Sequence, residues 1–205
     1  MTNKKEHIID DDRLQGVLID SEAIHTRIES LAQEIKDAYA GEKSVCLMGV
    51  LKGASIFVSD LIRELRSVGM RGLRLDFVRA STYQSGMKGA GEKTRKVKIS
   101  GMTCDNVEGC SILLVDDILD QGFTLSALKD HFLTELKAKS VKTCVFLEKK
   151  LESPSPEVLE LRKHFKVDFK GFEVNDRWVV GYGLDVGEEF RDLPYVALAR
   201  EECFR

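Results

Sequence analysis

Residues 111–125 read SILLVDDILDQGFTL, and this stretch decides the fold. It begins with an apolar run, 112–115, that has no polar alternation, which is typical of a strand covered on both faces in a parallel sheet. Three carboxylates, Asp116, Asp117 and Asp120, follow within five residues. Gly122 then precedes an amphipathic stretch that opens at Thr124. The pattern predicts a strand, a loop and a helix of an α/β fold.

This order of elements also predicts a binding site. In open α/β sheets, ligands lie beyond the carboxyl ends of the strands, and the following helix offers free N–H groups that suit a phosphate. The acids suit ribose hydroxyls or, through water, a divalent cation, and Gly122 permits close approach of the backbone. The simpler alternative is a buried strand followed by a helix-capping Asp. Three acids with Gly and Thr exceed what a cap needs, so we expect a sugar-phosphate site.

The composition restricts the remaining possibilities. The chain has 205 residues, enough for one α/β domain with a substantial core, and a net charge of -3 with 32% charged residues. These values give no electrostatic reason to expect binding to nucleic acid or to an anionic membrane. The five Cys form no CxxC pair, and three lie in or beside apolar runs, which favours buried free thiols. With no apolar signal core at the N-terminus, we expect a cytoplasmic protein.

The part of the chain before the central stretch is predicted to add a helix over 21–39, a strand over 44–50 and a helix over 54–65. Between the last two lie Lys52 and Gly53, which can present an ammonium and a backbone N–H to a polyanion. A strand over 72–80 then leads into a polar, Gly-rich tract. Because Glu92 separates Gly91 from Lys93, this tract lacks a P-loop signature, and we expect a mobile loop or, alternatively, a solvated hairpin.

The part after the central stretch is predicted to form a strand over 141–147, a short helix over 157–164 and a strand over 167–174. A tail with the strings DRWVVGYGLD (176–185) and EEFRDLPY (188–195) follows. Taken alone, Trp178 in the first string would be read as a core aromatic, and the charges after residue 147 as a solvated turn.

Residues 112–124 resemble the phosphoribosyl-pyrophosphate (PRPP) motif of type I phosphoribosyltransferases: a hydrophobic strand, two acids, two hydrophobic residues, Asp, a small residue, Gly, any residue and Thr. Two positions depart from it. Asp116 stands where Glu is common and keeps the carboxylate, whereas Gln121 replaces a small hydroxyl residue and loses that contact with phosphate. The tail narrows the resemblance to hypoxanthine-guanine phosphoribosyltransferases, because it carries their aromatic-Val-[VI]-Gly-Tyr-[AG]-Leu-Asp string and their [YF]-R-x-L ending.

The resemblance implies a role for each matching residue. Asp120 is the candidate for proton transfer at N7 of the base, and Thr82 and Tyr83 begin an active-site loop, roughly 81–98, that closes over the reacting centre. PRPP and its ribose phosphate would be bound by Asp116, Asp117, Gln121, Gly122, Phe123 and Thr124, pyrophosphate by Lys52, Gly53 and Arg191, the purine by Lys149, Trp178, Val179 and Asp185, and magnesium by Asp185, Asp116 and Asp117. In the family, the peptide bond at the lysine matched by Lys52 is commonly cis.

The implied fold is a single phosphoribosyltransferase domain over 1–205: a mainly parallel, twisted sheet flanked by helices (core roughly 37–165), with a small hood from the N-terminal segment and roughly 166–205. The implied reaction transfers 5-phosphoribose from PRPP to N9 of hypoxanthine or guanine and gives IMP or GMP and pyrophosphate, with Mg2+ required. Family members are dimers or tetramers. A transferase of the same fold for xanthine or a pyrimidine, and a PRPP-sensing regulator without turnover, are the alternatives.

Overall fold

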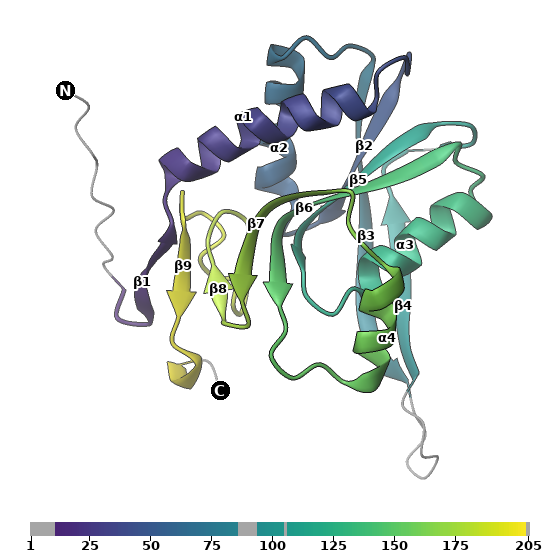
Figure 1. Ribbon diagram of the computed structural model, residues 1–205. Helices are drawn as coiled ribbons and strands as arrows, with labels where there is room; N and C mark the ends of the chain where they lie inside the picture. Colours follow the sequence, from purple (N-terminus) through teal and green to yellow (C-terminus); the bar gives the residue numbers. More distant parts are fainter. Residues whose placement is uncertain (1–10, 86–93, 105, 204–205) are drawn as a thin grey trace, which may run out of the picture.

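The computed structural model describes residues 11–85, 94–104 and 106–203, with the backbone alone of 81–85 and 94–96. Its main sheet has six strands in the order β4-β3-β2-β5-β6-β7 (Figure 1). The strands span β2 Val45–Leu51, β3 Leu73–Ser85, β4 Thr94–Met102, β5 Ser111–Leu119, β6 Ser140–Lys150 and β7 Phe169–Asn175. All neighbours are parallel except β3 and β4. The prediction of a mainly parallel sheet is confirmed.

Helices cover both faces of this sheet, because its central strands are apolar on both sides. On β5, Leu113 and Val115 pack with α1 (Ser21–Ala38) and α2 (Ser55–Ser67), whereas Ile112 and Leu114 pack with α3 (Phe123–Thr134) on the opposite face. The helix α4 (Pro156–His164) lies on the α3 face and adds Leu161 to that core. The continuous apolar run 112–115 thus fits a strand that is buried on both faces.

A second, smaller sheet forms the hood. It has the order β1-β9-β8, with β1 Leu14–Ile19, β8 Val179–Val180 and β9 Val196–Ala199, all antiparallel, and a short 3-10 helix, η1 Glu201–Cys203, follows β9. Strands from opposite parts of the sequence, β1 and β9, thus lie side by side in this sheet (Figure 1). Tyr182, Leu184 and Val196 pack into the α1 and α2 side of the main core, so the hood is fastened to the sheet.

Several predicted boundaries differ from the structure. β5 continues through Asp116 and Asp117 to Leu119, and β6 runs to Lys150, because their backbones keep pairing past the apolar runs. β7 pairs with β6, so the main sheet reaches residue 175, beyond the predicted core limit of 165. Of the C-terminal part predicted for the hood, the segment after residue 175 joins β1 there. The flanks of the predicted loop over 81–98 are paired strands rather than loop, and residues 86–93 lie outside the described part.

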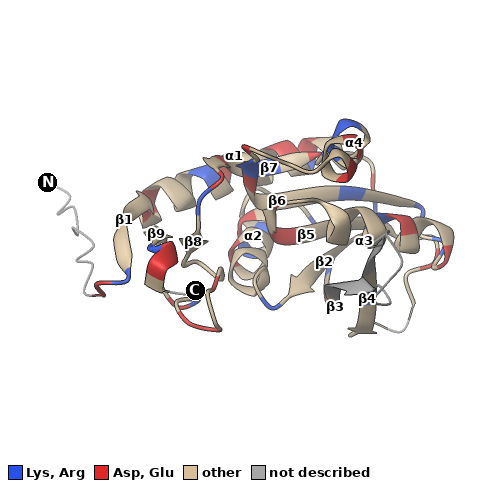
Figure 2. Cartoon of the chain, turned by 90° about the horizontal axis from the view of Figure 1, so that it is seen from below, with Lys and Arg blue, Asp and Glu red and all other residues tan. Residues whose placement is uncertain are grey.

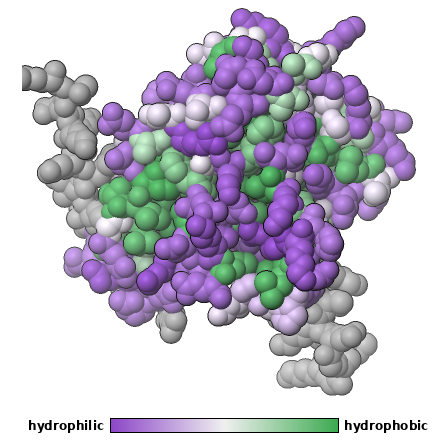
Figure 3. Space-filling model, viewed as in Figure 1, coloured by the Kyte–Doolittle hydropathy of each residue, from purple (hydrophilic) through white to green (hydrophobic). Residues whose placement is uncertain are grey.

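In Figure 2, Lys and Arg are interspersed with Asp and Glu along the chain, and neither sign of charge gathers on one side in this view. Among the described residues, no helix is long and apolar enough to cross a membrane. Hydrophobic surface gathers on the side where β1 and β9 lie (Figure 3), and Leu18 of β1 is 43% exposed there. Cys46 and Cys144 are buried free thiols as predicted, whereas Cys110 is only partly buried.

Candidate active site

The site lies where the order of strands reverses. From β2 the chain crosses through α2 to β3 on one side, and from β5 it crosses through α3 to β6 on the other. The loops after β2 and β5 therefore diverge and leave a crevice at the carboxyl ends of two neighbouring strands. Lys52 and Gly53 follow β2, and Asp120 and Gln121 follow β5, so the topology brings both predicted phosphate loops together.

The two loops touch each other directly. A Cβ placed on Gly53 would lie 1.6 Å from Oδ2 of Asp117, so the backbone at this position tolerates no side chain while the carboxylate keeps its place. A Cβ on Gly183 would lie 2.1 Å from the carbonyl oxygen of Gly53. The tail is thus packed against the β2 loop. This packing brings Arg191, which belongs to the tail, to the crevice. The peptide bond between Leu51 and Lys52 is cis.

A first cavity of about 630 Å³ fills this crevice. It is lined by ten residues predicted for PRPP, pyrophosphate or proton transfer, namely Lys52, Gly53, Asp116, Asp117, Asp120, Gln121, Gly122, Phe123, Thr124 and Arg191, together with Asp185. Gly122, with φ of 95°, precedes α3, and no side chain caps this helix. Gly122, Phe123 and Thr124 line the cavity, so the positive end of the α3 dipole lies beside it and suits an anion.

The two acids near the end of β5 are adjacent, Asp116 buried and Asp117 partly buried. Asp116 is 8% exposed, and its Oδ1 accepts a hydrogen bond of 3.0 Å from the N–H of Asp117. Burial, and then the neighbouring carboxylate of Asp117, raise the pKa of Asp116 well above its usual value. Burial also raises the pKa of Asp117, although the N–H of Ile118 and the charge of Arg191 oppose the rise. The pair therefore favours a hydroxyl or a cation as its ligand, because either one stabilises its negative charge.

Two cations, Lys52 and Arg191, also line this cavity. Arg191 donates through Nη1 to the carbonyl oxygen of Gly183 at 2.7 Å, and its Nη2 lies 2.8 Å from Oδ1 of Asp185. Its Nε is buried and has no hydrogen-bond partner among the described residues. Nζ of Lys52 lies 3.0 Å from Oε2 of Glu188, which also contacts Arg191 at 3.3 Å. A buried donor without a partner and two cations that share one exposed carboxylate make this part of the cavity suited to a polyanion.

A second cavity of about 610 Å³ adjoins the first. It is lined by the residues predicted to bind the purine, Lys149, Trp178, Val179 and Asp185, and also by Leu184, Val186 and Gly187. Asp117, Ile118, Asp120 and Asp185 line both cavities. A ligand in one cavity can therefore meet a ligand in the other at these four residues.

Lys149 projects from the end of β6 toward the shared wall. Its side chain is 14% exposed, and its Nζ lies 3.6 Å from Oδ1 of Asp176 and 4.0 Å from Oδ2 of Asp120. Trp178, at 38% exposed, offers a large ring to the second cavity although it belongs to the hood. A donor, a carboxylate and an aromatic surface around one hollow suit a planar heterocycle.

The structure thus brings together every predicted site residue whose side chain it describes. Thr82 and Tyr83 lie in β3, which pairs with β4, and their side chains lie outside the described part. Sequence reasoning missed Glu188 and Asp176, which pair with the two predicted ligand-binding lysines, and Ile118 on the shared wall. The signal for Glu188 was its place three residues before Arg191 in the tail string.

The carboxylates of the described residues do not form a metal cage by themselves. Over residues 11–85, 94–104 and 106–203, no group of three or more His, Cys, Asp or Glu side chains is arranged to hold an ion. Mg2+ is commonly held by one or two carboxylates together with phosphate oxygens of the substrate, rather than by a protein cage. Asp185, which lines both cavities, fits the first kind of site.

Comparison with known proteins agrees with this geometry. Residues 17–186 match the family model described as "Phosphoribosyl transferase domain", and this range includes every residue that lines the two cavities except Gly187 and Arg191. The fold and the site therefore define a phosphoribosyltransferase.

Relatives identify the branch. The chain is 41% identical over 186 residues to a hypoxanthine-guanine phosphoribosyltransferase of Aquifex aeolicus, covering 90% of this chain and 94% of the relative. It is 38% identical over 191 residues to that of Bacillus subtilis, covering 93% and 96%. A crystal structure of a hypoxanthine-guanine phosphoribosyltransferase from Bacillus anthracis superposes with a TM-score of 0.73 at 30% identity, covering 91% of this chain and 98% of that one. The chain belongs to the hypoxanthine-guanine phosphoribosyltransferase family.

Proposed function

We propose that this protein transfers 5-phosphoribose from PRPP to N9 of hypoxanthine or guanine and releases IMP or GMP and pyrophosphate. The observation that carries the proposal is the common wall of the two cavities, formed by Asp117, Ile118, Asp120 and Asp185. PRPP occupies the first cavity and the purine the second, so C1 of the ribose meets N9 of the base at this wall. In the reaction, the C1–O bond to pyrophosphate breaks and the C1–N9 bond forms.

The first cavity stabilises the charges that develop as the C1–O bond loosens. Lys52 and Arg191 stabilise the departing pyrophosphate, which takes the electron pair. Asp116 and Asp117 hold the ribose hydroxyls and favour positive charge on the ring. The backbone from Gln121 to Thr124 binds the 5′-phosphate at the N-terminus of α3 and so orients the sugar. Because this binding uses backbone groups, Gln121 in place of a hydroxyl residue is tolerated.

The second cavity selects and orients the base. Trp178 stacks on the purine, a contact worth about 1 to 3 kcal/mol, and the backbone of Val179 pairs with the base edge. Nζ of Lys149 donates to the 6-oxo group and opposes binding of adenine, whose 6-amino group also donates. Discrimination of this kind reaches roughly 10⁴-fold when the polar group is left unpaired. Asp120 takes the proton at N7 as the new bond forms at N9.

Magnesium is part of this proposal. Bound with PRPP, it would neutralise charge on the leaving pyrophosphate, and Asp185 would hold it, with Asp116 and Asp117 acting through the ribose hydroxyls. The loop that starts at Thr82 and Tyr83 is proposed to cover the site. We also propose a cytoplasmic homodimer or homotetramer that requires neither nucleic acid nor a membrane. The buried thiols of Cys46 and Cys144 suit a reducing compartment.

The test is to incubate the purified protein with PRPP, Mg2+ and each base separately, and to follow formation of nucleotide. We expect turnover with hypoxanthine and guanine and little with adenine. Turnover with xanthine alone would support the same-fold alternative. PRPP binding with no turnover on any base would support the regulator, although Lys149 and Trp178 around the second cavity argue against it.

The assignment of Lys149 has its own test. Lys149→Ala should weaken use of hypoxanthine and guanine selectively, because it removes the donor to the 6-oxo group. Lys150→Ala is the matched control, since Lys150 follows in the same strand but is exposed and pairs with Glu173. Equal losses of kcat/KM for every base, adenine included, would contradict the assignment.

A further inference from the structure

The helix α4 places an arginine behind the active site. Its first turn is capped by Ser155, whose side chain accepts from the N–H of Val158, and Pro156 occupies the start of the helix. Val158 is buried and Leu161 packs in the α3-side core. These contacts fix the face of α4 that carries Arg162, whose side chain is only 17% exposed.

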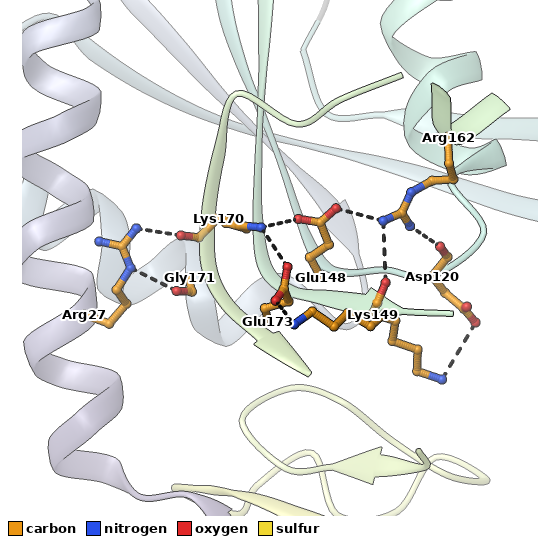
Figure 4. Close-up of polar contacts among 9 residues, drawn as sticks. Arg27, Asp120, Glu148, Lys149, Arg162, Lys170, Gly171 and Glu173 are labelled. Atoms are coloured by element: carbon orange, nitrogen blue, oxygen red, sulfur yellow. Dashed lines mark hydrogen bonds and ion pairs between the residues drawn. The ribbon is translucent and has the colours of Figure 1, made fainter. Parts of the chain in front are cut away.

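Arg162 contacts the backbone of two site residues with one guanidinium (Figure 4). Its Nη1 donates to the carbonyl oxygen of Asp120. Its Nη2 donates to Oε1 of Glu148 at 2.8 Å and lies 3.5 Å from the carbonyl oxygen of Lys149. Asp120 begins the loop after β5, and Lys149 is the last residue but one of β6. The guanidinium therefore connects the two backbone segments that carry the proposed proton acceptor and the proposed purine donor.

The stem of Arg162 also packs against the phosphate loop. A Cβ placed on Gly122 would lie 3.4 Å from Cδ of Arg162, an ordinary contact distance. Arg162 itself lines neither of the two ligand cavities. Any effect of Arg162 on the reaction therefore acts through the backbone of Asp120 and Lys149, which it contacts.

The partner carboxylate is itself held from the other side. Oε2 of Glu148 accepts from Nζ of Lys170 at 2.8 Å, and Lys170 also contacts Glu173 at 3.2 Å. Arg27 of α1 donates to the carbonyl oxygens of Lys170 at 2.6 Å and Gly171 at 2.9 Å. Figure 4 shows these contacts running from α1 across β7 and β6 to α4. The guanidinium of Arg162 is thus anchored to the rigid sheet, which is the requirement for orienting a flexible loop.

We propose that Arg162 is a positioning residue for the transfer reaction: by holding the carbonyl of Asp120, it sets the carboxylate of Asp120 beside the ammonium of Lys149 in the wall of the purine cavity. The carboxylate stays free of Arg162 itself, with Oδ2 at 4.0 Å from Nζ of Lys149. The inference rests on the proposed function for the role of Asp120, whereas the hydrogen bond from Arg162 to the carbonyl of Asp120 does not depend on that function.

The test uses Arg162→Met, which keeps an aliphatic stem against Gly122 and removes the donors. A second variant, Arg162→Lys, keeps the positive charge on a single donor nitrogen but lacks the planar fork that reaches both acceptors. Lys163→Met is the matched control, because Lys163 follows on the same helix but is exposed and pairs with Glu160. For each protein, kcat and KM are measured, and hydrogen exchange is followed by mass spectrometry in peptides that cover 116–125.

We expect kcat to fall roughly 10- to 100-fold in Arg162→Met, the range that small misplacement of a reacting group produces. Arg162→Lys should be intermediate and Lys163→Met should match wild type. Exchange should quicken in the 116–125 peptides of Arg162→Met and stay unchanged in peptides from α2. Wild-type kcat in a folded Arg162→Met protein, or exchange equal to wild type in these peptides, would overturn the proposal.

The route through Asp120 is tested by repeating Arg162→Met in an Asp120→Asn background. If Arg162 acts through the carboxylate, the second substitution should change kcat by less than about twofold, because the group that it positions is already gone. A further loss as large as that in the wild-type background would overturn this route. The exchange measurement needs no turnover, so it separates failure of this inference from failure of the proposed function.

Discussion

Oε2 of Glu188 lies 3.0 Å from Nζ of Lys52, although the two residues belong to loops that are far apart in the sequence. The same carboxylate lies 3.3 Å from Arg191. The hydrogen bond from Lys52, and then that from Arg191, lower the pKa of Glu188. Glu188 thus holds the two cations that the proposed pyrophosphate site uses. An anionic ligand that binds Lys52 and Arg191 therefore has to replace Glu188 as their partner.

Glu188→Gln should therefore strengthen binding of pyrophosphate. The pair with Lys52 is exposed on both sides, so the gain should be modest, up to about fivefold in Kd. Isothermal titration with pyrophosphate and Mg2+ measures it, and the gain should shrink at high salt. Glu189→Gln is the matched control, since Glu189 pairs with Arg13 instead. Weaker binding in Glu188→Gln would show that the carboxylate orients the cations rather than competing for them.

Gly53→Ala should damage the site through contact alone. The added methyl would lie 1.6 Å from Oδ2 of Asp117, so the carboxylate or the β2 loop has to move. We expect kcat/KM for PRPP to fall roughly 100-fold, as displacement of about 1 Å in an active site can produce. Gly16→Ala, at a position with open space around the Cβ, is the control and should retain activity. Activity within a few-fold of wild type would contradict the tight fit.

Asp116→Asn should make the protein more stable and less able to bind PRPP. Burial raises the folded-state pKa of Asp116, so its carboxyl opposes folding progressively as the pH rises from about 4 through the folded-state pKa. Asn can still accept from the N–H of Asp117 but carries no charge. The free energy of unfolding of the variant should exceed that of wild type by about 1 kcal/mol or more at neutral pH, a rise in Tm of about 2–4 °C.

The pH dependence is the sharper measurement for this variant. Thermal unfolding followed from about pH 4 to pH 8 should show the difference between Asp116→Asn and wild type growing as the pH rises. Near pH 4 the difference should be smallest, because the raised pKa keeps Asp116 neutral in the folded protein and the unfolded chain is only about half ionised at this position. A difference that stays constant over this range would rule out the raised pKa as its cause.

Asp120→Asn should lower turnover and leave binding of PRPP nearly intact. Loss of a proton acceptor at N7 typically lowers kcat by roughly 10²- to 10⁴-fold, whereas the backbone groups that hold the 5′-phosphate are retained. Steady-state kinetics gives kcat, and titration with PRPP gives its Kd. The control Asp130→Asn removes an exposed carboxylate on α3. Unchanged kcat would remove Asp120 from the chemistry.

The sequence alone was enough to predict the class of fold and most of the site. The apolar run 112–115 predicted a strand buried on both faces, and α1, α2, α3 and α4 begin and end within a few residues of their predicted limits. Such patterns are local, since periodicity and capping depend on neighbouring residues. The acids after the run predicted a sugar-phosphate site from their chemistry, whereas the residues of the tail were assigned to the site through the resemblance of its strings to those of the family.

Only the tertiary structure decided how these residues meet. The reversal of strand order between β2 and β5 places Gly53 against Asp117, and the packing of Gly183 on the β2 loop delivers Arg191 to the same crevice. The pairs of Glu188 with Lys52 and of Arg162 with the carbonyl of Asp120 join segments far apart in the chain. A sequence specifies local preferences, whereas such contacts depend on crossover connections and close packing of the whole domain, and no short pattern encodes them.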